Sequence, residues 1–148
     1  MLVREIVQLK GGILYTASAQ QTLASAVDAM AELDVGSLLI MQDGKMVGLL
    51  TFREVMQALK RNDGSVDGVL ISDVMIKNPV TAYPDMDAND LRRLMVESRS
   101  RYLPVLDGDV LLGVISFLDV AKAVLEEQNF ENKMLKNYIK NWPEAAAG

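Results

Sequence analysis

GLLTFREV at residues 48–55 and GVISFLDV at residues 113–120 are two versions of one eight-residue pattern. The two stretches lie 65 residues apart, and the same shift aligns residues 16–55 with residues 81–120 without a gap. Eight of these 40 pairs are identical, and many others keep their chemistry. Because a repeat at a fixed spacing reports one structural unit used twice, the sequence predicts two tandem copies of the same unit.

Each copy shows the same order of local patterns. Apolar residues at helical spacing follow a short extended stretch, over residues 23–33 and again over residues 88–96. Two apolar runs of strand length then flank Asp43-Gly44 and Asp107-Gly108, and Asp-Gly between apolar runs predicts a hairpin. A second helix is expected after Thr51 and after Ser116. The predicted order is strand, helix, strand, strand, helix, twice over.

The strands are nearly all apolar, which predicts that both faces of each sheet are covered. A copy of about 60 residues is too small to bury a full core alone. We therefore expect an α/β (α+β) fold in which two β-α-β-β-α repeats pack sheet to sheet about a pseudo-twofold axis. The expected boundaries are repeat 1 at 1–62, a linker at 63–68, repeat 2 at 69–128 and a C-terminal extension at 129–148.

The C-terminal extension continues a long helix predicted over residues 117–140. Apolar residues in its second half recur three and four positions apart, which is typical of a helix with one covered face. This face could fold back on its own module or pair with a second chain, and we expect a homodimer. Trp142-Pro143 should end the helix, and residues 144–148 should fray.

Composition narrows the chemistry. The 148 residues include no Cys and no His, which excludes disulfides, thiolate nucleophiles, histidine-dependent triads and zinc sites built from these residues. A net charge of −5 argues against a general nucleic-acid binder. No apolar run is long enough to span a membrane, and the N-terminus does not read as a secretory signal, so a cytoplasmic location is expected. No Gly-rich phosphate-loop motif is present, and we expect no enzyme activity and no metal.

Three strings of the second copy resemble the tandem CBS-domain pair, or Bateman module: DVMIKNPVT at 73–81, RYLPVLD at 101–107 and GVISFLDV at 113–120. VREIV at 3–7 and GLLTFREV at 48–55 match them in the first copy. The resemblance covers roughly residues 1–128, and the extension is similar to that of small bacterial two-CBS-domain proteins.

This resemblance implies a regulatory, signal-transducing module without catalysis. Such a module binds AMP, ADP, ATP, NAD or S-adenosylmethionine in clefts between its repeats and acts on a regulated enzyme or transporter. The alternative is a structural dimerisation module whose clefts no longer bind a ligand.

The resemblance also marks Thr51 with Glu54, and Ser116 with Asp119, as candidate ribose and phosphate contacts. An ionised carboxylate accepts hydrogen bonds from both hydroxyls of a ribose, and the hydroxyl at the start of a helix can donate to phosphate. The same spacing is also that of a helix capping box, a purely structural device. Both interpretations stay open at this point.

The remaining candidates line the same expected clefts. Arg53 and Arg101 would reach phosphate or, alternatively, form surface contacts; Tyr102 would stack on a base or belong to the core. Gly36 and Ser37 occupy the equivalent positions of the first copy, where Gly36 would permit close approach of a ligand. Thr16 with Ala17, and Thr81 with Ala82, lie at strand ends and would line the adenine pocket, partly through main-chain groups. Pro104, two residues after Tyr102 in the same strand, is the last candidate.

Overall fold

The computed structural model describes residues 1–140. The predicted helix end at Trp142-Pro143 and the tail at 144–148 lie outside the described residues. The elements of the first half are α1 (Val3–Lys10), β1 (Thr16–Ser18), α2 (Leu23–Leu33), β2 (Ser37–Gln42), β3 (Lys45–Thr51) and α3 (Phe52–Arg61). Those of the second half are α4 (Ile71–Val74), β4 (Ile76–Lys77), α5 (Ala88–Ser98), β5 (Tyr102–Asp107), β6 (Val110–Ser116) and α6 (Phe117–Lys140).

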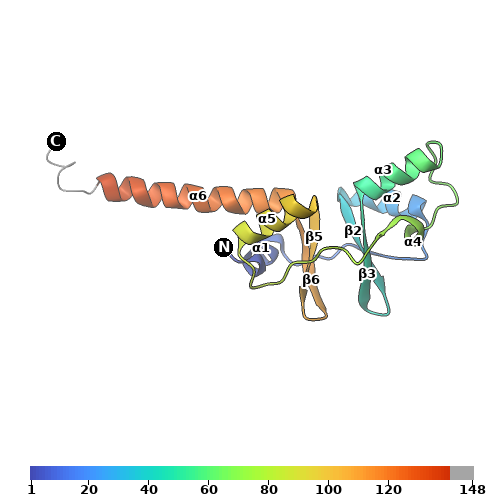
Figure 1. The fold of residues 1–148 in the computed structure, drawn as a ribbon, viewed down its shortest axis with the longest axis horizontal. Helices are drawn as coiled ribbons and strands as arrows, with labels where there is room; N and C mark the ends of the chain where they lie inside the picture. Colours follow the sequence, from blue (N-terminus) through green and yellow to red (C-terminus); the bar gives the residue numbers. More distant parts are fainter. Residues whose placement is uncertain (141–148) are drawn as a thin grey trace.

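Two hairpins form the centre of the molecule. β2 pairs with β3, and β5 pairs with β6, in registers related by the same 65-residue shift. β1 and β4 extend the first hairpin into a four-stranded sheet, while β5 and β6 form a two-stranded sheet. The hairpins stand side by side with the helices on the two outer sides (Figure 1), so the predicted arrangement of two repeats with sheets facing each other is confirmed.

Strand alternation explains why both faces of the first sheet are apolar. Leu38, Ile40 and Leu50 pack with α2 and α3 in one core cluster. Leu39 and Leu49 are paired neighbours on β2 and β3, are at most 2% exposed, and do not belong to that cluster. Because successive side chains of a strand point to opposite faces, Leu39 and Leu49 lie on the face toward the other repeat.

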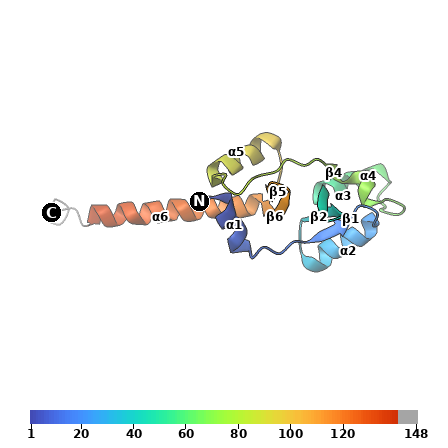
Figure 2. The same cartoon turned by 90° about the horizontal axis from the view of Figure 1, so that it is seen from below.

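The two short leading helices are exchanged between the repeats. Val3, Ile6 and Val7 of α1 belong to the core of the second repeat, whereas Ile71 of α4 belongs to the core of the first. The main-chain hydrogen bonds that hold them are equivalent: the Val3 N–H donates to Met86 at 2.8 Å, and the Ile71 N–H donates to Gln21 at 3.0 Å. The connections that carry the chain from one repeat to the other are visible from below (Figure 2).

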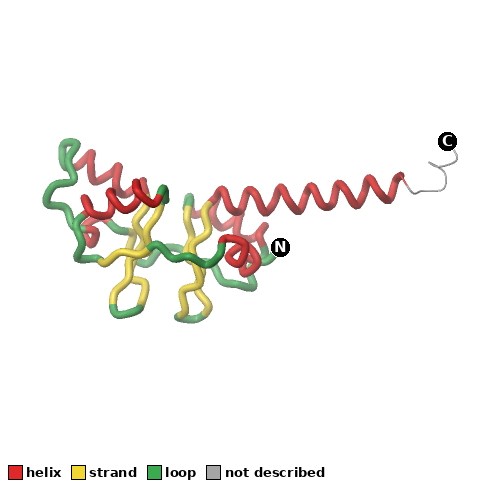
Figure 3. The backbone as a smooth tube through the Cα atoms, turned by 180° about the vertical axis from the view of Figure 1, so that it is seen from behind, coloured by secondary structure: helices red, strands yellow, loops and turns green. Residues whose placement is uncertain are grey.

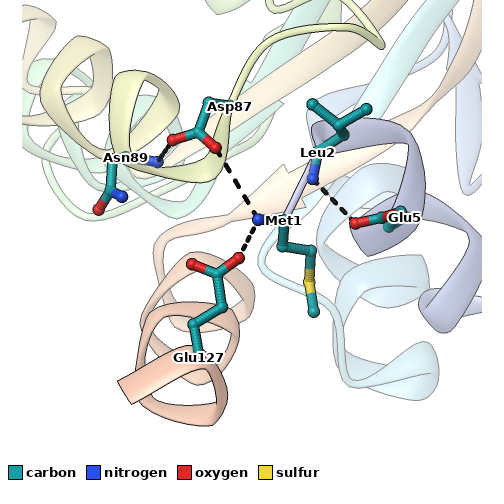
Figure 4. A network of polar contacts seen from close by, with 6 residues as sticks. All are labelled: Met1, Leu2, Glu5, Asp87, Asn89 and Glu127. Atoms are coloured by element: carbon teal, nitrogen blue, oxygen red, sulfur yellow. Dashed lines mark hydrogen bonds and ion pairs between the residues drawn. The ribbon is translucent and has the colours of Figure 1, made fainter. Parts of the chain in front are cut away.

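Polar contacts fix the start of α1 between α5 and α6. The Met1 ammonium contacts Glu127 of α6 and lies 3.8 Å from the Asp87 carboxylate at the start of α5. Asp87 also caps α5 by accepting from the Asn89 N–H at 2.9 Å (Figure 4). Three helices far apart in sequence therefore meet at one charged cluster.

The first strand of the second copy is shorter than the repeat predicts. β1 pairs in parallel with β2 over three residues, but its counterpart is a single bridge between Ala82 and Val105. In the first copy, the Leu39 N–H donates to the Tyr15 carbonyl at 2.9 Å. Pro104 occupies the position equivalent to Leu39 and has no N–H, so this ladder bond cannot form.

Only the first part of α6 packs on the module. Val120 and Ala123 are buried in the core of the second repeat, and the helix then continues away from it (Figures 1 and 3). Its distal apolar side chains are 55–64% exposed: Phe130, Met134, Leu135 and Ile139. No helix within residues 1–140 is both long and apolar enough to cross a membrane.

Candidate functional site

Cleft 1 lies between the two repeats and has a volume of about 680 Å³. The first repeat contributes the end of β3 and the first turns of α3, from Thr51 to Gln57. The second repeat contributes residues 98–102 and the extended segment at 78–80. This size is within the range of sites for small organic ligands.

Cleft 2, of about 470 Å³, is the counterpart of cleft 1 on the other side of the pseudo-twofold axis. It is lined by Ser116, Phe117 and Leu118 at the start of α6 and by Val35–Ser37 of the first repeat. Ile13 and Tyr15 line it at the positions equivalent to Asn78 and Val80. The same positions of the repeat thus build both clefts.

The lining differs in charge. Arg53, Arg99 and Arg101 all line cleft 1, and none of them forms an ion pair with a carboxylate within residues 1–140. The 65-residue shift places Leu118, Asp34 and Gly36 at these three positions of the other copy. Cleft 1 is therefore locally cationic in a chain of net charge −5, whereas Lys10 is the one cation specific to cleft 2 in the described lining.

Glu54 lies at the wall of cleft 1 and is only 5% exposed. Its Oε1 accepts from the Thr51 N–H at 2.9 Å and from the Thr51 hydroxyl at 2.6 Å. The Arg53 N–H in turn donates to the Thr51 hydroxyl oxygen at 3.2 Å. Glu54 Oε2 accepts no hydrogen bond within the described part of the chain, so one carboxylate oxygen is left for another donor.

Asp119 is the equivalent carboxylate of the second copy. Its Oδ2 accepts from the Ser116 N–H at 2.8 Å and lies 2.7 Å from the Lys10 ammonium. Burial alone would raise the pKa of Asp119, but the hydrogen bonds from Lys10 and Ser116 outweigh it and lower that pKa below its usual value. Asp119 itself does not line cleft 2, although both partners do.

The two carboxylates also answer the capping question. Thr51 with Glu54, and Ser116 with Asp119, each make the reciprocal bonds of a capping box at the start of α3 and α6. The structural interpretation is thus correct for both pairs. It leaves one oxygen of each carboxylate, Glu54 Oε2 and Asp119 Oδ1, without a donor in the described part of the chain.

Tyr102 forms part of the wall of both clefts, as does Arg101. A Cβ added to Gly36 would lie 1.8 Å from the Tyr102 hydroxyl oxygen and 2.7 Å from the adjoining ring carbon. The space over Gly36, where a ligand was expected to approach, is thus filled by the Tyr102 ring. Ser37, next to Gly36, lines cleft 2 and is 6% exposed.

Besides Asp119, five candidates line neither cleft: Thr16, Ala17, Thr81, Ala82 and Pro104. The main chain of Ala82 is used in strand pairing, since its N–H donates to Pro104 and its carbonyl accepts from Leu106, both at 2.9 Å. Ala17 is likewise paired with Ile40 in the parallel ladder. The main-chain N–H and carbonyl of Ala82, which were expected to recognise adenine, are therefore already used in strand pairing.

Arg99 and Lys10 are site residues that the sequence patterns did not indicate. Arg99 caps the end of α5 in the left-handed region at φ 55°, the same position and conformation as Asp34 after α2. Lys10 is the last residue of α1. The 65-residue alignment could have identified Arg99, but Lys10 reaches its site only because α1 crosses to the other repeat. No group of three or more acidic side chains within residues 1–140 is arranged to hold a metal ion.

A sequence profile of the CBS domain matches residues 11–61 and 71–126. The chain belongs to the CBS-domain family, and it carries a tandem CBS-domain pair. It is 32% identical over 107 residues to the CBS domain-containing protein YhcV of Bacillus subtilis, covering 72% of this chain and 75% of that protein. Mitochondrial CBSX3 of Arabidopsis thaliana is 26% identical over 127 residues, and the match covers 82% of this chain and 62% of CBSX3.

Solved CBS-domain structures share the fold. A CBS-domain protein from Burkholderia ambifaria superposes with a TM-score of 0.80 at 28% identity, covering 86% of this chain and 96% of that one. Two structures at 22% identity contain ligands. The CBS-domain pair of MJ0100 was solved with 5'-methylthioadenosine and S-adenosyl-L-methionine (TM-score 0.75, covering 86% and 98%), and CBSX2 was solved with AMP (TM-score 0.66, covering 78% and 90%).

Proposed function

We propose that this CBS-domain pair is a regulatory module that binds an adenosine-containing ligand in cleft 1. The ligand class is AMP, ADP, ATP, NAD or S-adenosylmethionine. The observation that carries the proposal is the convergence of Arg53, Arg99 and Arg101 on one cleft, none of them paired with a carboxylate in the described part of the chain. Unpaired arginines in a cleft between repeats are suited to a phosphate-bearing ligand.

Glu54 supplies the complementary contact. Its Oε2 is available to accept from a ribose hydroxyl, while Oε1 stays bound to Thr51. A charge-assisted hydrogen bond of this kind holds the neutral ribose beside the arginines that would bind the phosphate. Thr51 and the start of α3 place that carboxylate at the helix N-terminus, which also favours an anionic group nearby.

The relatives solved with ligands support this ligand class. CBSX2 binds AMP, and the MJ0100 pair binds S-adenosylmethionine. Both ligands contain adenosine, and they differ in the charge of the group attached to it. The arginines of cleft 1 favour the phosphate-bearing members of the class for this chain.

The module would act by reporting ligand occupancy rather than by catalysis. A ligand in cleft 1 contacts α3 of one repeat and residues 98–102 of the other, so binding favours one relative arrangement of the repeats. The change would be read by a second copy of the chain, or by an enzyme or transporter, in the cytoplasm.

Calorimetric titration with AMP tests the proposal, with ATP, NAD and S-adenosylmethionine as comparisons. Arg101→Gln should weaken AMP binding by about 10- to 100-fold, the scale of a lost hydrogen bond between charged groups. Arg92→Gln is the matched control, because Arg92 is an exposed α5 residue outside both clefts and its loss changes the net charge equally.

Melting temperatures give an independent readout. A ligand at a hundred times its Kd adds about 2.7 kcal/mol to the free energy of unfolding. No heat and no thermal shift with any of the four ligands would reject the proposal, as would equal losses in the two arginine variants.

A second candidate function is dimerisation, favoured by the exposed distal half of α6. Phe130, Met134, Leu135 and Ile139 leave more than half of each side chain exposed. Truncation after Glu127 removes all four and should convert a dimer to a monomer in light scattering, because this apolar surface would be the part that pairs. A truncated chain that is still dimeric would show that association uses the modules and not the helix.

A further inference from the structure

The Lys10 side chain is bound at the edge of cleft 2 by two acceptors. Its ammonium lies 2.7 Å from Asp119 Oδ2 and donates to the Val114 carbonyl at 2.8 Å. Asp119 Oδ2 also accepts from the Ser116 N–H at 2.8 Å. The carboxylate position that the repeat offers to a ribose is therefore already neutralised by a side chain of the same chain.

Cleft 1 has no equivalent contact. Glu54 forms no ion pair within residues 1–140, and its Oε2 has no described donor. The Asp119 side chain is 19% exposed and the Lys10 side chain is 36% exposed. Water therefore screens the attraction between these two charges less than it screens that of a surface pair. The two carboxylates thus differ in whether a cation occupies them.

We infer that Lys10 is a specificity-determining residue that keeps a nucleotide out of cleft 2, so that each chain takes one nucleotide and takes it in cleft 1. The inference rests on the proposed function. A ribose that hydrogen-bonds to Asp119 Oδ2 would have to displace the ammonium from it, and the released ammonium would have to be solvated again. The lowered pKa of Asp119 supports this, because it keeps the carboxylate ionised and paired at neutral pH.

The position of Lys10 gives this contact a structural consequence. Lys10 is the last residue of α1, and Gly11 follows it at φ 87° as the helix ends. α1 packs in the core of the second repeat through Val3, Ile6 and Val7. Lys10 therefore ties the end of that helix to the start of α6, and a ligand in cleft 2 could use Asp119 Oδ2 only by releasing this tie.

The test counts AMP bound per chain by calorimetry and equilibrium dialysis on the full chain. The wild type should bind one AMP, and Lys10→Met should bind two, because the methionine keeps the apolar stem and removes the ammonium. Lys10→Arg should restore one, since a guanidinium can still pair with Asp119. Lys45→Met, in the β2–β3 hairpin and outside both clefts, is the control and should leave the count at one.

Two further variants assign each site. Adding Arg53→Leu to Lys10→Met should leave one AMP, now in cleft 2, because Arg53 lines cleft 1 only. Adding Asp119→Asn to Lys10→Met should abolish the second site. If Lys10→Met lowers the melting temperature sharply, Lys10→Gln, which can still donate to Val114, replaces it with the same expected count.

Two AMP in the wild type, or one in Lys10→Met and in Lys10→Gln, would overturn the inference while leaving the proposed function intact. No binding of AMP, ATP, NAD or S-adenosylmethionine to the wild type would instead reject the proposed function. In that case a single site gained in Lys10→Met and lost with Asp119→Asn would still support the role of Lys10, and no binding in either variant would overturn it.

Discussion

Cleft 1 and cleft 2 are built by equivalent positions of one repeated sequence, yet their linings differ. Arg101 lines both clefts, but Arg53 and Arg99 line cleft 1 alone, and the equivalent positions of the other copy are Leu118 and Asp34. The carboxylates at their margins differ as well, since Asp119 is paired with Lys10. The repeat therefore determines where two clefts form, and a few side chains at the margins determine what each cleft can accept.

Apart from changes to the charged residues of the clefts, the largest effect on stability is expected at Tyr102, which lines both clefts. Gly36→Ala places a Cβ 1.8 Å from the Tyr102 hydroxyl oxygen, so the ring must move. We expect the free energy of unfolding to fall by about 1–3 kcal/mol, as for other overpacked sites. Chemical denaturation measures this, and a change in AMP affinity should accompany it because Tyr102 lines both clefts.

A double-mutant cycle separates this clash from other costs of the substitution. In a Tyr102→Ala background, Gly36→Ala should cost much less, because the two Tyr102 atoms nearest the new Cβ are gone and only Phe52, at 3.3 Å, remains close. An equal cost in both backgrounds would mean that Tyr102 is not what Gly36 accommodates, and the shared wall would have to be abandoned.

A smaller effect concerns the ion pair at cleft 2. The folded-state pKa of Asp119 is lowered, so its ionised form stabilises the fold above the unfolded-state pKa of about 3.9, and that stability is lost as pH falls through the folded-state pKa. Asp119→Asn should lower the free energy of unfolding by about 1 kcal/mol at pH 7, the net value of one hydrogen bond. The difference between wild type and variant should shrink as pH falls below about 4 and vanish only below the lowered folded-state pKa of Asp119.

Thermal unfolding between pH 3 and pH 7 measures this difference. Asp109→Asn is the control, because Asp109 is exposed in the β5–β6 turn and forms no ion pair in the described part of the chain. A wild-type advantage over Asp119→Asn that does not change with pH would contradict a role for the charge of Asp119.

Much of the fold follows from local sequence. The Asp-Gly turns, the apolar runs of strand length, the helical spacing of apolar residues and the 65-residue shift place the hairpins and helices where the structure has them. The sequence also indicated Thr51, Arg53, Glu54, Arg101 and Tyr102 as candidates for the clefts between the repeats, without assigning them to one cleft, and all five line cleft 1.

What the sequence could not supply depends on contacts between distant segments. The pairing of Lys10 with Asp119 requires α1 to cross to the other repeat, and no local pattern records that crossing. The loss of a strand at Ala82 depends on a proline in its partner, Pro104, and not on the residues of the strand itself. Glu54 and Asp119 occupy the same position of the repeat, and the difference between them in the structure is the cation beside Asp119.

The exchange of α1 and α4 also dictates an order of assembly as the chain is synthesised. The first repeat acquires Ile71 only after its own strands and helices have left the ribosome. α1 is synthesised before the other elements, but the residues that bury its apolar face lie between residues 82 and 123 and are synthesised much later. Contacts so distant in sequence slow folding, so Val3, Ile6 and Val7 form an exposed hydrophobic surface on the nascent chain until nearly the whole pair has been translated.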